Sequence, residues 1–422
     1  MAVTVVVGSQ WGDEGKGKVV DLLASQFDIV ARYQGGANAG HTIKWGDREH
    51  VLHLLPSGVF APGVHCLIGN GVVIDPKALV SEIQNVQELG YDLKGRLWIS
   101  GNAHCILPYH QALENIRSAD RIGTTKRGIG PAYTDKVART GIRIAELVDV
   151  DVFSKRVRAE VERKNLILRG SYGERGLDAE EIIAEYSDCA RTLAEYVTDT
   201  AHFLHEALDH GKKILAEGAQ GCLLDIDFGT YPYVTSSTPT AGGVCTGLGV
   251  PPTAITRTIG ISKAYCTRVG HGPFPTELTD TTGAYLQNAG GEFGATTGRP
   301  RRCGWLDLVA LRYSCRLNGF AELALTKLDV LSGLENVKVC VEYEQGGVTD
   351  SRFINDARLL DTVSPQYEVM QGWEEDIRGC RDFNELPGTA KDLINRIQSF
   401  TGIPVTMIST GPKRSQTIQM GC

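Results

Sequence analysis

The sequence Gly8-Ser-Gln-Trp-Gly-Asp13-Glu-Gly15-Lys16-Gly17-Lys18 is the most informative segment of the chain for its fold. It follows the apolar run Val3–Val7 and precedes the helix-like segment Val19–Phe27. Glycines in such a turn free backbone N–H groups to point inward, and the start of a helix carries partial positive charge. The segment therefore predicts an anion-binding loop, with phosphate as the expected ligand, in a protein of the α/β class.

This loop departs from the Walker A motif of phosphate-binding loops. Six residues separate Gly8 from Gly15, and Gly17 stands where Ser or Thr would hold Mg²⁺. A metal ligand must then come from elsewhere, and Asp13 is the candidate within the loop. The alternative is a glycine-rich turn that binds no ligand, because short motifs also match by chance.

A second glycine-rich segment, Gln34-Gly-Gly-Ala-Asn38-Ala-Gly40-His41-Thr42, follows the apolar run Ile29–Tyr33. Ligands of doubly wound sheets bind beyond the carboxyl ends of the strands. A second loop at that edge is expected to bring His41 to the phosphate site, although a single histidine is more often structural.

A third segment, Thr326-Lys-Leu-Asp329, follows the run Glu322–Thr326 and is similar to the Asn-Lys-x-Asp element of GTP-binding proteins, with Thr326 in place of Asn. The Asp329 carboxylate could accept hydrogen bonds from N1–H and the 2-amino group of guanine, which adenine does not offer. Such sites discriminate by as much as ~10⁴ to 10⁵. The element favours GTP over ATP, and a polar strand end is the alternative. The segment Ser409–Arg414 is expected to close over the base.

Short β-branched runs alternate with helix-like stretches along the chain. This pattern predicts a large, mostly parallel central sheet with a phosphate loop similar to a P-loop and with helical insertions. The expected strands are Val3–Val7, Ile29–Tyr33, Val51–Leu55, Cys66–Ile68, Lys213–Ala216, Ile255–Ile261, Glu322–Thr326, Val337–Val341 and Val405–Ile408. We expect a single domain over residues 1–422, with a helical excursion at about 145–211.

The composition is that of an ordinary globular protein with one deviation. The 422 residues carry a net charge of −7, which disfavours nucleic acid or an anionic membrane as a partner because both require a broad basic surface. Residues Met1–Val7 are expected to form a strand and not a signal peptide, and no long apolar run follows. The 11 cysteines have no zinc-binding spacing, so a cytoplasmic protein with reduced thiols is expected. Glycine is the deviation, with 49 residues, and predicts frequent close approach of backbone to ligand.

The chain has more polar loops than one nucleotide requires. Two are basic, Arg121–Tyr133 and Gly294–Arg302, and arginine pairs bidentately with carboxylates and phosphates. Two others, Glu217–Asp225 and Tyr231–Ser237, follow apolar runs. A solvated basic turn is the alternative for the first pair.

Together these segments resemble the adenylosuccinate synthetase family, in the same order from the first strand to the last. The matching stretches are Gln10–Lys18, Gly35–Thr42, Ile122–Tyr133, Val137–Arg139, Glu217–Asp227, Gly229–Ser237, Arg268–Glu277, Gly294–Arg301, Thr326–Asp329 and Ser409–Pro412. The resemblance implies Mg²⁺-dependent ligation of IMP with L-aspartate to adenylosuccinate through a 6-phosphoryl-IMP intermediate, with GTP as co-substrate and GDP and phosphate as products. This is a step of AMP biosynthesis, and IMP is the second nucleotide that the surplus loops require.

The resemblance also implies a role for individual residues. Asp13 matches the general base that removes the N1 proton of IMP, His41 the proton donor, and Lys16 and Gln220 complete the catalytic set. Mg²⁺ would be held by Asp13 and the carbonyl of Gly40. The family is homodimeric, and Arg139 would be contributed to the site of the neighbouring subunit.

The implied ligand contacts fall into three sets. GTP would be bound by Gly12, Asp13, Glu14, Gly15, Lys16, Gly17, Lys18, Gly40, His41, Thr42, Arg301, Lys327, Leu328, Asp329, Ser409, Thr410 and Gly411. IMP would be bound by Asp13, Glu14, Gly15, Lys16, Asn38, Ala39, Gly40, His41, Thr125, Arg139, Gln220, Thr235 and Arg299. Aspartate would be bound by Ala295, Thr296, Thr297, Gly298, Arg299, Pro300 and Arg301.

Two other functions are compatible with parts of the sequence. A GTP-binding regulatory protein without ligase activity would share the phosphate loop and the guanine element. It should also have switch segments, with a Thr for Mg²⁺ and an Asp-x-x-Gly after a strand, and no such arrangement is present. An ATP-dependent amide ligase on a related fold is disfavoured by Thr326-Lys-Leu-Asp329.

Overall fold

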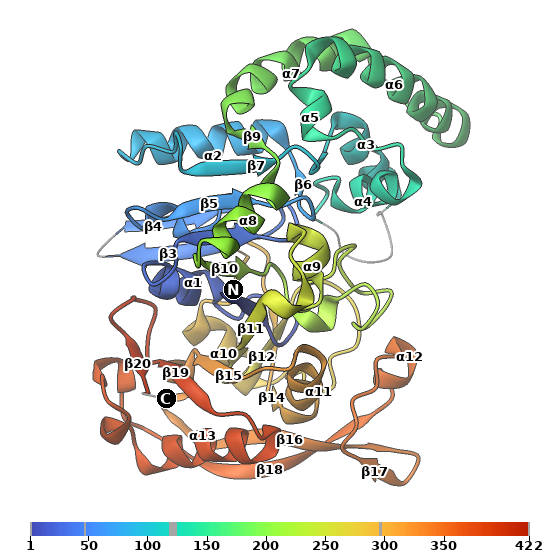
Figure 1. Ribbon diagram of the computed structural model, residues 1–422. Helices are drawn as coiled ribbons and strands as arrows, with labels where there is room; N and C mark the ends of the chain where they lie inside the picture. The colour runs from blue at the N-terminus through green and yellow to red at the C-terminus, as the bar shows by residue number, and fades with distance from the viewer. Residues whose placement is uncertain (1, 46–47, 118–124, 295–297, 421–422) are drawn as a thin grey trace.

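The computed structural model describes residues 2–45, 48–117, 125–294 and 298–420. A ten-stranded sheet runs through its middle in the order β20-β19-β15-β11-β1-β10-β2-β5-β7-β9 (Figure 1), and every neighbouring pair is parallel except β19 and β20. Its strands are β1 (Ala2–Gly8), β2 (Ile29–Arg32), β5 (His65–Ile68), β7 (Leu97–Ser100), β9 (Val197–Thr198), β10 (Lys213–Glu217), β11 (Ile255–Lys263), β15 (Glu322–Thr326), β19 (Val405–Ser409) and β20 (Thr417–Gln419). The expected fold class is confirmed.

Both faces of this sheet are covered. On β1, Val5 belongs to one buried hydrophobic cluster and Val6 to another, because successive side chains of a strand point to opposite faces. Strands covered on both faces read as continuous apolar runs, which explains why the sequence pattern found them. The helices are α1 (Lys16–Ala24), α2 (Pro76–Glu88), α3 (Pro108–Arg117), α4 (Ile129–Ala138), α5 (Ile144–Leu147), α6 (Val150–Tyr172), α7 (Ala179–Leu193), α8 (Thr200–Asp209), α9 (Gly243–Leu248), α10 (Thr281–Gly290), α11 (Leu308–Asn318), α12 (Ala357–Leu360) and α13 (Gly388–Thr401).

Two expected strands lie outside the central sheet, so their assignment to it was wrong. Val51–Leu55 overlaps β4 (Arg48–Leu52), which pairs with β3 (His41–Trp45) in a separate antiparallel hairpin. Val337–Val341 lies within β16 (Leu334–Gln345), which pairs with β14 (Leu306–Asp307), β17 (Val348–Asp350) and β18 (Ser364–Trp373) in a four-stranded sheet. A short apolar run has the same pattern in any sheet, so periodicity cannot assign it to one.

The remaining small sheets consist of two strands each. They pair β6 (Val73–Ile74) with β8 (His104–Cys105) and β12 (Cys266–Arg268) with β13 (Arg302–Gly304).

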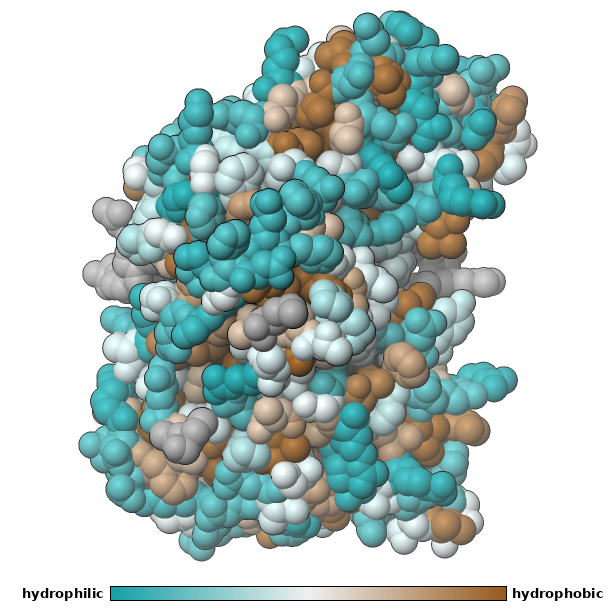
Figure 2. All heavy atoms as spheres, in the orientation of Figure 1, coloured by the Kyte–Doolittle hydropathy of each residue, from teal (hydrophilic) through white to brown (hydrophobic). Residues whose placement is uncertain are grey.

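The longest helices lie at one end of the molecule. Figure 1 shows α6 and α7 side by side beyond the edge of the central sheet that carries β7 and β9. Asp149 and Asp178 cap them, Asp149 by accepting one hydrogen bond and Asp178 by accepting two from backbone N–H groups of the first turn. Figure 2 shows a largely hydrophilic face, with hydrophobic residues gathered near these helices. Among the described residues, every helix is too short or too polar to cross a bilayer.

The central strands direct the functional loops to one edge. β19, β15, β11, β1, β10 and β2 are consecutive and parallel, so their carboxyl ends share that edge. The phosphate loop follows β1, the second glycine loop follows β2, and the Thr326–Asp329 element ends β15. Segments that lie hundreds of residues apart in the chain are thereby brought to one place.

Candidate active site

The phosphate loop between β1 and α1 owes its shape to residues in the left-handed region. Gly12, Asp13 and Gly15 have φ values of 91°, 59° and 88°, and Gly15 is the residue from which α1 begins. Glycine adopts this region without a steric penalty, whereas Asp13 is held in it by the surrounding loop. The backbone N–H groups of the first helical turn have no partner within the helix and suit an anion.

Glu14 fixes the loop from inside. Its buried carboxylate accepts hydrogen bonds from the N–H groups of Gln10 at 3.0 Å and Gly12 at 2.9 Å, and from Lys16 Nζ at 2.6 Å. Glu14 and Lys16, both expected to contact nucleotide, thus bind each other. A loop held by three bonds to one carboxylate is preorganised, which lowers the cost of ordering it around a ligand.

The position of Gly17 explains the missing Walker hydroxyl. A Cβ atom at Gly17 would lie 3.0 Å from Cβ of His41 and 3.2 Å from its Cα. The start of β3, which carries Thr42 after His41, therefore packs against α1 where a Ser or Thr side chain would stand. His41 is brought to the phosphate loop, beside Gly40 and the buried Ala39, as the sequence predicted for the second loop.

His41 forms a buried dyad with Glu217, the last residue of β10. Its Nδ1 is paired with Glu217 Oε1, and the same carboxylate accepts hydrogen bonds from Ser57 Oγ at 2.6 Å and Ser57 N at 2.8 Å. Burial lowers the pKa of His41. Burial by itself would raise the pKa of Glu217, but the neighbouring His41, Arg32 and Ser57 hold the pKa of that carboxyl below its usual range. An ionised Glu217 fixes Nδ1 as the protonated nitrogen and leaves Nε2 to face the site.

Two buried polar atoms of the predicted catalytic residues have no hydrogen-bond partner among the described residues. They are His41 Nε2 and Gln220 Oε1. Gln220 has a φ of 55° and donates through Nε2 to Asn38 Oδ1 at 3.2 Å, so the loops after β10 and β2 meet here. Buried polar atoms are rarely left unpaired, and those that are point to a functional role.

The base-reading element is tied to the phosphate loop. Thr326 Oγ1 donates a hydrogen bond to the carbonyl of Glu14 at 2.6 Å, which links the two loops directly. Lys327 has a φ of 60°, and its Nζ donates to the carbonyl of Gly290 at 2.5 Å. Burial raises the pKa of Asp329, and Leu328 between them is fully buried.

Lys18 connects the phosphate loop to the segment expected to close over the base. Its Nζ donates to Ser409 Oγ at 2.6 Å, to the carbonyl of Gly411 at 2.7 Å and to the carbonyl of Gln416 at 2.9 Å. The backbone N–H of Thr410 donates to the same Gln416 carbonyl. Burial lowers the pKa of Lys18 to about 8. All three hydrogens of its ammonium are thus used by this segment.

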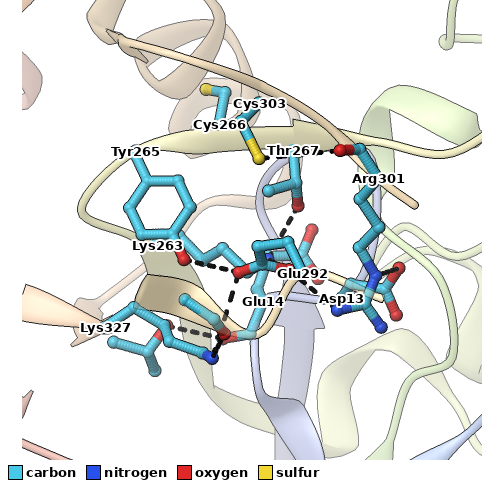
Figure 3. A network of polar contacts seen from close by, with 12 residues as sticks. Asp13, Glu14, Lys263, Tyr265, Cys266, Thr267, Glu292, Arg301, Cys303 and Lys327 are labelled. Carbon is cyan, nitrogen blue, oxygen red and sulfur yellow. Dashed lines mark hydrogen bonds and ion pairs between the residues drawn. The ribbon is translucent and has the colours of Figure 1, made fainter. Parts of the chain in front are cut away.

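The second basic loop meets the phosphate loop through Arg301. Its Nε is 2.9 Å from Asp13 Oδ2 and its Nη1 is 2.8 Å from Glu292 Oε2 (Figure 3). The predicted base and a predicted aspartate-binding arginine are therefore in contact. Gly298, Arg299 and Pro300 are exposed, whereas Ala295, Thr296 and Thr297 lie outside the described residues.

The remaining predicted contacts lie on separate elements. Thr235 Oγ1 is 3.2 Å from Ser237 Oγ, which donates to Gln34 at the start of the loop after β2. Thr125 is exposed near Arg127, whose guanidinium donates to the carbonyl of Ala37. Arg139 is exposed at the carboxyl end of α4, with a φ of 63°.

Sequence reasoning missed Glu217 and Glu292 as individual site residues. Glu217 left a weak signal, because an acidic residue that ends an apolar run at the functional edge is unusual. Glu292 left none, since Gly290–Gly294 reads as an exposed turn although this carboxylate is fully buried.

Comparisons with known proteins agree with this geometry. The family model of adenylosuccinate synthetase matches residues 5–418. The adenylosuccinate synthetase of Salinibacter ruber is 58% identical and that of Chlorobium chlorochromatii 52% identical, with coverage of 99% and 98% of this chain and 98% and 96% of theirs. The structure of the fully ligated adenylosuccinate synthetase from Plasmodium falciparum superposes with a TM-score of 0.95 at 41% identity, covering 99% of this chain and all of that one. The chain described here belongs to the adenylosuccinate synthetase family.

Proposed function

We propose that this protein ligates IMP with L-aspartate to give adenylosuccinate, with GTP converted to GDP and phosphate, as a step of AMP biosynthesis. Family membership supports the overall reaction. The observation that carries it in this chain is the meeting of a phosphate loop and a base-reading element with two unpaired buried atoms, His41 Nε2 and Gln220 Oε1.

The chemistry has two steps. The 6-oxygen of IMP is a poor leaving group, so the γ-phosphoryl group of GTP is first transferred to it while Asp13 takes the N1 proton. The amine of aspartate then attacks C6, phosphate leaves with the 6-oxygen, and the amine loses a proton. Asp13 is partly exposed within the phosphate loop. A general base must be accessible in this way, because it has to reach the proton of its substrate.

His41 serves the phosphoryl transfer. A dianionic phosphoryl group near Nε2 favours a protonated ring, and the Glu217 carboxylate stabilises that imidazolium through Nδ1. The ring then donates from Nε2 toward the 6-oxygen and the transferring group. Lys16, with one bond to Glu14, adds positive charge beside the phosphates.

Mg²⁺ fits the donors that the loop offers. Asp13 supplies one carboxylate whose side chain is 33% exposed, and Gly40, an exposed residue, would supply its backbone carbonyl. Mg²⁺ is commonly held by one or two carboxylates together with substrate phosphates, whereas the described residues show no cluster of three or more acidic, His or Cys side chains. When bound, the ion would neutralise charge on the nucleotide phosphates.

Each substrate is assigned to a particular set of loops. We infer that Asn38, Thr125, Gln220 and Thr235 hold IMP, with Arg299 reaching it from the second basic loop. Ala295–Arg301 would receive the carboxylates of aspartate, with Arg301 also near GTP. The guanine base would lie between Lys327–Asp329 and Ser409–Gly411.

A homodimer completes the proposed IMP site. Arg139 sits exposed next to Val137, which is 80% exposed, at the carboxyl end of α4. An exposed apolar residue beside an exposed arginine suits a contact with a second subunit. We propose a cytoplasmic location, because the ten described cysteines are free thiols, and reduced thiols are the rule in that compartment.

One assay tests the proposed function. The protein is mixed with IMP, L-aspartate, GTP and Mg²⁺, and the ultraviolet spectrum of the purine is followed. We expect conversion that needs all four components and that falls sharply when ATP replaces GTP. A GTP-binding regulatory protein without ligase activity, which family membership does not favour, would bind GTP and leave the IMP spectrum unchanged. No conversion, or equal turnover with ATP, would refute the function as stated.

A further inference from the structure

Glu292 is a buried carboxylate on which several elements of the site converge. Figure 3 shows it between the side chains of Lys263, Tyr265, Arg301 and Lys327. Lys263 Nζ lies 2.9 Å from each of its oxygens, the Tyr265 hydroxyl donates to Oε1, and Arg301 Nη1 donates to Oε2 at 2.8 Å. Lys327 Nζ is 3.9 Å from Oε1.

Glu292 also fastens the base of the second basic loop. The backbone N–H of Arg301 donates to the carbonyl of Glu292 at 2.9 Å, and Phe293 forms an antiparallel bridge with Pro300. Gln287 Nε2 donates to the carbonyl of Arg301 at 2.8 Å. The two ends of the proposed aspartate loop therefore meet at one residue, through its backbone and through its side chain.

The Glu292 carboxylate interacts with three cationic side chains and not with one lysine alone. Lys263 and Glu292 are both fully buried and already satisfy each other, with Thr267 Oγ1 as a further acceptor for Lys263 at 2.7 Å. Burial alone would raise the pKa of Glu292, but Lys263, Lys327 and Arg301 hold it at about 2. Buried ion pairs add little to stability on their own, since apolar residues often replace them without loss, whereas this carboxylate also binds cations from two elements of the site.

We propose that Glu292 is a positioning residue, which orients Arg301 of the aspartate loop toward Asp13 and holds Lys327 of the base-reading element in place. This inference rests on the proposed function. One carboxylate would then align the aspartate-binding and guanine-binding parts of the site. IMP binding would depend on it least, because only Arg299 of the proposed IMP contacts lies in the second basic loop, whereas Asn38 and Gln220 contact each other on the loops after β2 and β10.

The test is steady-state kinetics of Glu292→Gln in the full-length protein. The substitution keeps the shape and removes the charge, so Arg301 and Lys327 lose a charge-assisted partner. We expect kcat/KM for aspartate to fall about tenfold or more, and the KM for GTP to rise severalfold, while the KM for IMP changes less than about twofold. A merely structural role would lower the amount of folded enzyme without separating the three KM values.

Glu322→Gln is the matched control. Glu322 is also buried and bound by an arginine, Arg257, but it begins β15 and so lies at the opposite end of the strand from Thr326. We expect it to lower thermal stability to a similar extent and to leave all three KM values unchanged. Unchanged constants for aspartate and GTP in Glu292→Gln, or an equal rise in all three, would overturn the proposal.

A second variant covers the case in which Glu292→Gln does not fold because Lys263 is left unpaired. Glu292→Gln combined with Lys263→Met removes both buried charges, and Arg301 and Lys327 still lose their carboxylate. The same separation of KM values is expected. A double variant with normal constants, or one that also fails to fold, would show that Glu292 serves the fold and not the site. Absence of turnover in the unmodified protein would instead defeat the proposed function.

Discussion

Replacing Glu217 with glutamine tests whether the His41 dyad drives phosphoryl transfer. The carboxylate accepts from His41 Nδ1, from Ser57 Oγ at 2.6 Å and from Ser57 N at 2.8 Å, and it is fully buried. Glutamine retains one acceptor oxygen and introduces an NH₂ group. Whichever way the amide turns, that NH₂ group faces a donor, and the negative charge that stabilises the imidazolium is lost.

The magnitude follows from these contacts. A hydrogen bond to a charged group contributes about 1.5–3 kcal/mol, and this one is needed most when the ring carries its proton in the transition state. At about 1.4 kcal/mol per tenfold change in rate, kcat should fall by roughly 10- to 150-fold. The KM values for GTP, IMP and aspartate should change much less, because Glu217 contacts the histidine and not the proposed ligand groups.

The assay measures initial rates by purine absorbance at saturating substrates, with GDP and IMP binding followed by calorimetry. Ser57→Ala is the control, since it removes the hydroxyl and leaves the His41–Glu217 pair and the backbone N–H of residue 57 in place. We expect only a few-fold loss of kcat in that variant. A folded Glu217→Gln enzyme with kcat within about twofold of the unmodified protein would refute the role of the dyad.

Three further predictions concern other parts of the site. Asp13→Asn should abolish ligation and largely preserve binding of guanine nucleotides by calorimetry, and an active variant would refute its role as the base. Arg139→Leu should raise the KM for IMP, and mixing it with Asp13→Asn subunits should restore some activity; mixed dimers without activity would contradict a shared site. Burial lowers the pKa of Lys18 to about 8. Below that pH its ammonium group has three hydrogens to donate to its three acceptors in residues 409–416, and above that pH the neutral amine has only two. The KM for GTP should therefore rise as pH increases through about 8, and Lys18→Met should show a raised KM without this rise; a flat profile in the unmodified protein would count against it.

The same Lys18 pKa has a consequence for stability with the opposite sign. Its folded pKa of about 8 lies below the ordinary lysine value of 10.5, so between these values the unfolded chain binds the proton and the native state does not. The free energy of unfolding should therefore increase with pH across that window. If raising the pH through about 8 weakens nucleotide binding while the free energy of unfolding stays constant or increases, the weaker binding is due to deprotonation of Lys18 and not to unfolding.

Much of the site could be predicted from sequence because its signals are local. The left-handed glycines 12 and 15 lie in one short loop after an apolar strand, and Thr326-Lys-Leu-Asp329 ends another. Assignment of strands to sheets was less reliable, since β4 and β16 carry the same kind of apolar run as the central strands. Which sheet a strand joins depends on pairing partners that the run itself does not specify.

Long-range partners could not be predicted. His41 and Glu217 are 176 residues apart, and Thr326 reaches Glu14 across 312 residues. Glu292 lies in a stretch with the composition of a surface turn, yet it is fully buried among cations from three other segments. Burial of a polar side chain depends on what packs over it, and that is a property of the whole fold.

The phosphate loop, the α/β class and the family could be predicted from the sequence, because glycine placement, strand periodicity and the order of motifs are local properties of the chain. Packing in the folded protein pairs Glu217 with His41, places His41 where a side chain at position 17 would stand, and brings Glu292 into contact with Arg301 and Lys327. These contacts arise because the carboxyl ends of parallel strands lie at one edge of the sheet. In that closely packed region of low dielectric, the stability of each charged side chain depends on partners from distant segments of the chain.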